Sequence, residues 1–324
     1  MSQIDEANSQ IEKIDARDLK ILEILKENSR TTYQQIAKKV LLSHDAVADR
    51  IKGMHSKGII SKFTLDINYR LLDYDEYYLF LQLLENDDEE LERFFDYLKK
   101  ANWFSQVIHY SGNRDLCIAL KSHNLNQTDE VITNMNNHFA KLILGQEMMR
   151  KVKNLSKENM VPRKKELDLD AKDVLLLNLL LEDSRMNAVE LATKLSLSAD
   201  AVIYRMKKLA HTGIIRRFTI SVNVNKLGYR WYTILLLMNL LTVDEERKLQ
   251  EYGRRNKNVV RIFKTIGEWN IMLDFLVKNS YELHSCIKDI KNMLRGSLKD
   301  YDISLGYKEL KNSFVIDLKD KITS

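Results

Sequence analysis

The chain has 324 residues, which is enough for two or more domains of ordinary size. Hydrophobic residues make up 44% and charged residues 30%, a composition typical of a globular protein rather than a fibrous or disordered one. The net charge of +5 is a mild basic excess that is compatible with nucleic acid as a partner.

Three features bear on where the protein works. Cys117 and Cys286 have no CxxC spacing, which predicts ordinary thiols in a reducing compartment. The N-terminus, MSQIDEANSQIEKID, lacks the basic and apolar segments of a signal peptide. The longest apolar stretch, residues 232–241, has about half the length of a membrane helix. We therefore expect a cytoplasmic protein without membrane contact.

After an N-terminal tail (residues 1–14), the first elements are three short helices. Residues 19–28 have a wide apolar face, and residues 32–40 form a second, shorter helix. Ser43 is a good N-cap for a third helix with an apolar face, and Gly58 ends that helix before a strand. This order predicts a winged helix-turn-helix over residues 15–64, whose third helix lies in the DNA major groove.

The next segment, residues 65–152, alternates strands and helices. We expect strands at 77–84, 105–112, 115–122 and 147–152, and helices at 87–100 and 125–140. The order βαββαβ is that of a ferredoxin-like domain, in which two helices cover one face of the sheet. The other face needs a partner, because large exposed apolar surfaces are rare in soluble proteins. We expect this face to pair with a second sheet, within the chain or between chains, and further self-association into a homodimer or larger assembly.

A linker at residues 153–169 holds the only proline, Pro162, and a basic cluster. Beyond it the first unit recurs with a constant shift of 155 residues. The matches include Asp15 with Asp170, Ser29-Arg30 with Ser184-Arg185, Gly58 with Gly213, and Gly112 with Gly267. The repeat predicts a second winged helix-turn-helix at 170–219, a second βαββαβ domain at 220–310 and a C-terminal tail at 311–324. The fold class is therefore α+β, in two tandem copies that we expect to hold separate cores.

Candidate DNA contacts lie on the third helices and the strands that follow them. They are Ser43, His44, Asp45, Arg50, Lys52 and Lys62 in copy one, and Ser198, Tyr204, Arg205, Lys207, Lys208, Arg216 and Arg217 in copy two. Four basic residues oppose two acidic ones between 43 and 62, whereas five oppose one between 198 and 217. Phosphate contacts supply most of the affinity for double-stranded DNA, so copy two is expected to bind more strongly. Arg216 and Arg217 occupy the expected wing.

The chain resembles the Lrp/AsnC (leucine-responsive, feast/famine) transcription regulators. The matching segments are IDARDLKILEILKENSR, LSHDAVADRIKGMHSKGIISKFT and YSGNRDLCIAL. Members of that family work as dimers of single units, so this tandem chain resembles a dimer joined in one polypeptide. The resemblance also implies an amino-acid effector near the glycine turn before the third sheet strand. The corresponding residues are Gly112 and Asp115 in copy one, and Gly267 and the uncharged Asn270 in copy two.

Two other functions fit the same fold. Sirohaem decarboxylases resemble this family, include fused two-unit forms, and need histidines near a large apolar pocket. None of the seven histidines recurs at the 155-residue shift. An interaction scaffold whose helix-turn-helix domains do not bind DNA is the other alternative. We find no catalytic triad, phosphate-binding loop or metal-spaced cluster, and we predict a regulator with no catalytic residue, metal or cofactor.

Overall fold

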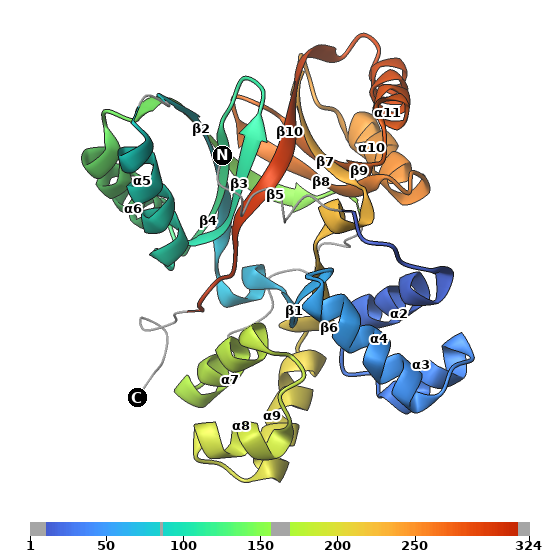
Figure 1. Ribbon diagram of the computed structural model, residues 1–324. Coiled ribbons are helices and arrows are strands. Elements are labelled where there is room, and N and C mark those ends of the chain that lie inside the picture. Colours follow the sequence, from blue (N-terminus) through green and yellow to red (C-terminus); the bar gives the residue numbers. More distant parts are fainter. Residues whose placement is uncertain (1–10, 85–86, 157–168, 317–324) are drawn as a thin grey trace. The chain divides into compact units, whose positions relative to one another are not determined.

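The computed structural model describes residues 11–84, 87–156 and 169–316. They fold into two compact units, and each unit draws on both repeats. The helix-turn-helix unit holds residues 11–72, 169–228 and Ile316, and the barrel unit holds residues 73–156 and 229–315 (Figure 1). The predicted α+β class is confirmed. Most of the two predicted tails and of the linker, including Pro162, lies outside the described residues.

Each repeat contributes three helices to the helix-turn-helix unit, as predicted. They are α2 (Ala16–Glu27), α3 (Tyr33–Val40) and α4 (His44–Ser56) in copy one, and α7 (Ala171–Glu182), α8 (Ala188–Leu195) and α9 (Ala199–His211) in copy two. The predicted N-caps of the third helices are confirmed, because Ser43 and Ser198 each accept a hydrogen bond from a backbone amide three residues on. Gly58 and Gly213 have φ angles of 71° and 80°, a left-handed conformation that ends each helix.

The strands that follow these helices pair with each other. β1 (Ile60–Ile67) and β6 (Ile215–Val222) run antiparallel, and Thr64 faces Thr219, its equivalent in the other repeat. The core around the copy-one helices includes Ile220 of β6. The expectation of separate cores is therefore wrong for this unit, because the two copies exchange strands. Short 3-10 helices follow, η1 (Tyr69–Leu72) and η2 (Val224–Leu227).

The barrel unit contains both predicted βαββαβ segments. Copy one supplies β2 (Asp75–Leu83), α5 (Asp88–Lys100), β3 (Phe104–Ser111), β4 (Leu116–Ser122), α6 (Leu125–Phe139) and β5 (Ile143–Asn154). Copy two supplies β7 (Arg230–Met238), α10 (Val243–Arg255), β8 (Val259–Gly267), β9 (Ile271–Val277), α11 (Ser280–Met293) and β10 (Leu298–Asn312). In Figure 1, α5 and α6 cover one part of the sheet and α10 and α11 cover another.

The strands of both copies close into a single barrel with the order β10-β3-β4-β2-β5-β8-β9-β7. The last strand of each copy makes the closure: β5 pairs with β2 and then with β8, and β10 pairs with β7 and then with β3. Because these strands continue into the other copy's sheet, they extend to Asn154 and Asn312, past the predicted domain ends at 152 and 310.

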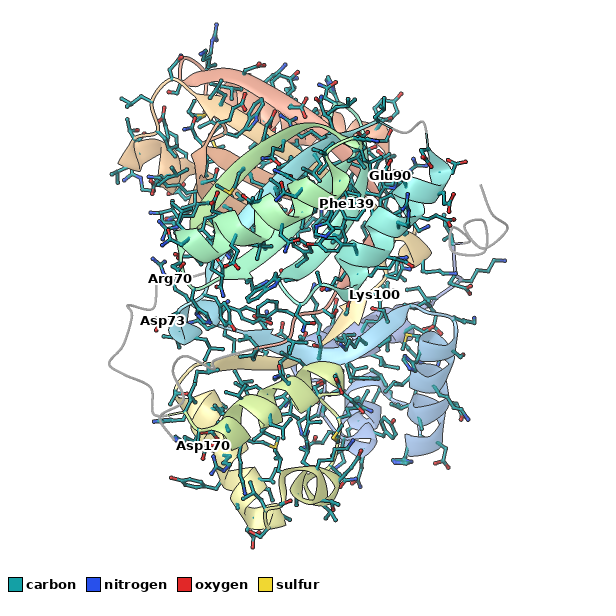
Figure 2. All side chains as sticks on the ribbon, turned by 90° about the vertical axis from the view of Figure 1, so that its left-hand side faces the viewer. Arg70, Asp73, Glu90, Lys100, Phe139 and Asp170 are labelled. Atoms are coloured by element: carbon teal, nitrogen blue, oxygen red, sulfur yellow. The ribbon has the colours of Figure 1, made fainter. Side chains whose placement is uncertain are left out.

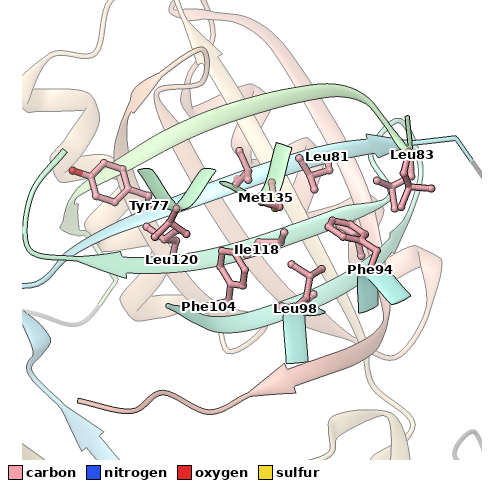
Figure 3. Close-up of a cluster of buried hydrophobic side chains, with 14 residues drawn as sticks. Tyr77, Leu81, Leu83, Phe94, Leu98, Phe104, Ile118, Leu120 and Met135 are labelled. Carbon is pink, nitrogen blue, oxygen red and sulfur yellow. The ribbon is translucent and has the colours of Figure 1, made fainter. Parts of the chain in front are cut away.

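Hydrophobic clusters of the described residues fill the barrel unit, and three of them position its strands and helices. One lies between the copy-one strands and their helices (Figure 3), and an equivalent one lies in copy two. Phe139 of α6 contacts α5, where its ring centroid lies 4.7 Å from that of Phe94 (Figure 2). The third cluster combines residues of both copies, among them Tyr78, Phe80 and Phe263. The prediction that the two sheets bury each other's open faces is confirmed within the single chain.

Candidate nucleic-acid interface and ligand cavity

The outer faces of α4 and α9 are the candidate DNA-reading surfaces. Of the predicted contacts, His44, Asp45 and Lys52 are exposed on α4, and Tyr204 and Lys207 are exposed on α9. Asp49 on α4, and Asp200 and Ile203 on α9, are exposed beside them. The two faces differ most at one equivalent pair of positions. Tyr204 is 69% exposed on α9, whereas α4 carries the acidic Asp49 there. A carboxylate repels phosphates, so the α9 face is the better suited of the two to DNA.

Arg50 and Arg205, both predicted DNA contacts, hold the third helix against the first. Arg50 donates to Asp15 and Asp18, each at 2.7 Å. Arg205 makes the same two contacts to the equivalent acids, Asp170 and Asp173. The hydrogen bonds that Arg50 donates to Asp18 and Asp15 raise the pKa of Arg50. The motif recurs at the 155-residue shift, which is a signal that sequence reasoning passed over.

The remaining basic residues of the candidate interface are also partly engaged. Arg216 and Arg217 lie in β6, paired with β1 rather than in a free wing, and both contact Asp66 of β1. Lys208 lies 3.7 Å from Asp173, and Lys62 is half-buried in β1. Ion pairing therefore offsets much of the basic excess counted for copy two. The role of these residues in DNA binding stays a prediction.

A pair of serines marks the axis between the two helix-turn-helix copies. The hydroxyls of Ser29 and Ser184 lie 2.7 Å apart, and both side chains are buried. Arg30 donates across the axis to the carbonyls of Ser184 and Met186, and Arg185 donates back to those of Ser29 and Thr31. The two Ser-Arg dipeptides recur at the 155-residue shift, but the repeat alone did not indicate that they contact each other.

Beside this axis lies a cavity of about 500 Å³, lined by Arg30, Thr31, Thr32, Tyr33, His44 and Arg185. The ring of Tyr33 faces Arg185, whose guanidinium carbon lies 4.9 Å from the ring centroid. Copy two carries alanine at the positions equivalent to Tyr33 and His44. The cavity is therefore a feature of copy one and the axis.

The predicted effector glycines lie where each copy meets the last strand of the other. Gly112 and Gly267 have φ angles of 148° and 145°, which other residues rarely adopt. A Cβ on Gly267 would lie 2.5 Å from the carbonyl oxygen of Met148, and one on Gly112 would lie 3.4 Å from that of Ile303. Both glycines therefore permit the close strand approach that closes the barrel.

Asp115 and Asn270 make equivalent hydrogen bonds. The Asp115 carboxylate accepts from the backbone amide of Leu83 at 2.7 Å, and the Asn270 side-chain oxygen accepts from that of Met238 at the same distance. Both side chains thus fix the end of the neighbouring strand, whichever copy they belong to. Their role in effector binding stays a prediction.

Next to the Gly112 turn is a polar cavity of about 490 Å³. Its lining residues are Gln82, Asn113, Arg114, Glu147, Glu268, Trp269, Asp300, Tyr301 and Asp302. Arg114 is only 6% exposed and pairs with Glu147 and Asp302, which come from different copies. Four carboxylates face this single arginine, so the cavity carries an excess of negative charge.

Known families match the helix-turn-helix segment of each repeat. Residues 14–61 match the winged helix-turn-helix DNA-binding family, and residues 169–210 match the AsnC-type helix-turn-helix domain. A relative from Pyrococcus horikoshii, the uncharacterised HTH-type transcriptional regulator PH0061, is 32% identical over 126 residues. The match covers 39% of this chain and 80% of that protein. LrpA, an HTH-type transcriptional regulator of the same organism, is 38% identical over 94 residues, or 29% of this chain and 63% of LrpA.

The chain belongs to the Lrp/AsnC family. As a member of it, the protein is a DNA-binding transcription regulator, and its relatives carry the names of regulators rather than of enzymes. Each of these relatives matches less than half of this chain. The evidence for the tandem arrangement of this Lrp/AsnC regulator therefore comes from its own sequence and structure, and not from these relatives.

A solved structure that spans both repeats of this Lrp/AsnC protein is that of a named enzyme. The siroheme decarboxylase NirDL superimposes with a TM-score of 0.64 over 94% of this chain and 95% of that chain, at 15% identity. Identity this low shows a shared fold. The polar cavity beside Trp269 is lined by no histidine.

The described part of the chain offers neither a membrane span nor a metal cluster. No helix in it is long and apolar enough to cross a bilayer. Across the same residues, no group of three histidine, cysteine or acidic side chains is arranged to hold a metal ion.

Proposed function

We propose that this Lrp/AsnC regulator reads an asymmetric operator with its two recognition helices, as a single-chain counterpart of a dimer. The main support for this proposal is the helix-turn-helix unit. Strand pairing and the Ser29–Ser184 contact join α4 and α9 within this one compact unit. Dimeric helix-turn-helix proteins bind two half-sites because their symmetry repeats the recognition helix. Here the repeat is covalent, but the two reading faces differ in sequence.

The candidate contacts divide into two kinds. Lys52 and Lys207, at equivalent positions, are exposed, and we assign them to phosphates. We assign the exposed His44 and Tyr204 to bases or sugars. Arg50 and Arg205 fix the helix orientation through their ion pairs. Ser43 and Ser198 begin the recognition helices as N-caps. A protein with this task is expected in the cytoplasm, where bacterial or archaeal DNA lies.

The first experiment is a gel-shift assay on duplex DNA from upstream of the protein's own gene, with a shuffled duplex as control. We expect preferential binding of the upstream duplex, and a loss of affinity of roughly tenfold or more between about 50 and about 200 mM salt. Equal binding of both duplexes would contradict sequence-specific regulation. Absence of DNA binding, together with an absorbance change on titration with sirohaem, would favour the decarboxylase alternative.

We further propose that an amino-acid effector binds at the polar cavity beside Gly112. The cavity has an acidic excess, and a carboxylate is the simplest partner for an α-ammonium group. Family resemblance assigns the ammonium contact to Asp115, whose neighbours Asn113 and Arg114 line the cavity. Calorimetry against the twenty amino acids tests this proposal, and no binding by any of them would contradict it.

A further inference from the structure

Several residues of the barrel meet their own equivalents from the other repeat. Trp269 occupies the position in copy two that Arg114 occupies in copy one, and the guanidinium carbon of Arg114 lies 5.3 Å from the Trp269 ring centroid. Gln106 and Arg261 are likewise equivalent, and Arg261 donates to Gln106 at 3.3 Å. If two identical halves formed the barrel, each such residue would meet a second copy of itself. The side chains at these positions therefore indicate whether the barrel is more stable with two identical halves (like halves) or with one half from each copy (unlike halves).

The Arg114 cluster is built for unlike halves. Arg114 donates to Glu147 at 2.6 Å and to Asp302 at 2.5 Å, and the Trp269 indole also donates to Glu147. Glu147 and Asp302 are themselves equivalent positions. Two copy-two halves would place two tryptophans beside two carboxylates with no arginine between them. Two copy-one halves would instead bury two arginine side chains in a space that now holds one arginine and one indole.

Side-chain volumes inside the barrel point the same way. Tyr110 of copy one meets Thr233 of copy two, with 2.6 Å between their hydroxyl oxygens, and both residues are buried. The copy-one equivalent of Thr233 is Tyr78, and the copy-two equivalent of Tyr110 is Thr265. Pairing two copy-one halves would therefore oppose tyrosine to tyrosine, and pairing two copy-two halves would oppose threonine to threonine. The first overpacks the interior and the second leaves a void.

We propose that the barrel interior is a pairing-selective surface: a copy-one half accepts a copy-two half as its partner and rejects a second copy-one half. The complementary features are the single arginine shared by two carboxylates and the large-to-small contact of Tyr110 with Thr233. The same selection excludes pairing between two copy-two halves. A barrel made of two copy-one halves or of two copy-two halves is thereby disfavoured. Each barrel then goes with one copy-one and one copy-two helix-turn-helix segment. This inference rests on the fold and does not depend on the proposed operator.

A double-mutant cycle in the full-length chain tests the proposal. Trp269→Arg recreates the arginine–arginine contact of two copy-one halves, and Arg114→Trp recreates the tryptophan–tryptophan contact of two copy-two halves. The exchange variant, with both changes, restores one arginine, one tryptophan and two carboxylates. We expect each single change to lower the folding equilibrium constant by about tenfold or more, and the exchange variant to return to within about threefold of the wild type.

The matched control is a pair of equivalent residues that do not meet across the barrel. Met135 and Ile290 lie in the separate cores of copy one and copy two. Met135→Ile and Ile290→Met should have additive effects in the same urea-unfolding measurement. Additive losses for Arg114→Trp and Trp269→Arg would overturn the proposal, as would an exchange variant that fails to fold. An exchange variant that folds where a single variant does not would support it.

Discussion

Charged side chains inside the barrel come unequally from the two repeats. Glu76, Lys121 and Lys151 belong to copy one, and Arg261 and Asp274 belong to copy two. Their equivalents in the opposite copy are Trp231, Leu276, Gly306, Gln106 and Ala119. Buried ions are costly unless they are paired, which explains why each copy supplies both signs of charge itself.

Glu76 links this cluster to the pH dependence of stability. It lies 2.5 Å from Lys151 and 3.8 Å from Lys121. Burial alone would raise its pKa, but the two lysines outweigh burial and lower the pKa of Glu76 to about 2. The pKa of a glutamate is about 4.3 in the unfolded chain. As the pH falls, the unfolded state therefore takes up this proton before the folded state does. The charged Glu76 therefore adds roughly 3 kcal/mol to the free energy of unfolding above about pH 5, and this contribution is lost as the pH falls towards 2.

We expect Glu76→Gln to flatten this part of the pH profile. The measurement is the free energy of unfolding in urea at about pH 5 and about pH 2.5, for the wild type and the variant. The wild type should lose more stability than Glu76→Gln between the two pH values, because the variant has no proton to take up at this site. Parallel losses would show that the Glu76 carboxylate is not held charged by its lysines.

At the scale of single elements, the recognition helices share their structure and differ in their surface. Both α4 and α9 begin at a serine N-cap and end before a left-handed glycine. Both are held by an arginine that reaches the N-terminal acids of the first helix. Folding therefore constrains the inner face and the ends of the helix alike in both copies, and leaves the outer face free to differ.

This difference predicts unequal roles in DNA binding. Lys207→Ala in α9 should weaken binding more than Lys52→Ala in α4, because Asp49 already opposes phosphate contact on the α4 face. Each lost phosphate contact reduces the slope of log affinity against log salt by about one unit, so Lys207→Ala should lower the slope by about that amount.

The measurement is a salt titration of the dissociation constant for both variants. Lys99→Ala, an exposed position on α5 of the barrel unit, serves as the control and should leave the slope unchanged. A larger effect from Lys52→Ala would assign the dominant contact to copy one.

At the scale of the whole molecule, the chain is organised by kind rather than by repeat. Both helix-turn-helix segments form one unit and both βαββαβ segments form the other. An effector bound at the cavity proposed above would act from the barrel unit on the helix-turn-helix unit. A ligand can shift DNA affinity only by binding two states unequally.

We expect Asp115→Asn to abolish the effector response while leaving effector-free DNA binding intact. Asn270 shows that an amide oxygen makes the same strand contact, so the substitution preserves the local structure. What it removes is the carboxylate charge that we propose as the partner of the ammonium group. The measurement is the DNA dissociation constant with and without the amino acid found by calorimetry. If Asp115→Asn still responds and Asp300→Asn does not, the ammonium contact lies within the cavity instead.

The elements, their order and the duplication were predictable from the amino-acid sequence. Local signals are strong here: Ser43 and Ser198 fit the cap position, Gly58 and Gly213 fit the helix end, and the apolar periodicity gives the buried face. The family followed from the same segments. The outward residues of the third helices were also predictable, because a helix period fixes which side chains share a face.

How the two copies combine was not predictable from the sequence and became known from the fold. Residues far apart in the chain meet where β1 pairs with β6 and where β5 and β10 close the barrel. The same is true of the ion pairs made by Arg50, Arg205, Arg216 and Arg217. Strand pairing and ion pairing depend on which surfaces meet in space, and no local pattern records that choice. The 155-residue shift showed which residues are equivalent, whereas the fold showed that Ser29 meets Ser184 and Arg114 meets Trp269. Two equivalent side chains make contact only where the two copies meet within one unit, and the sequence does not show where that is.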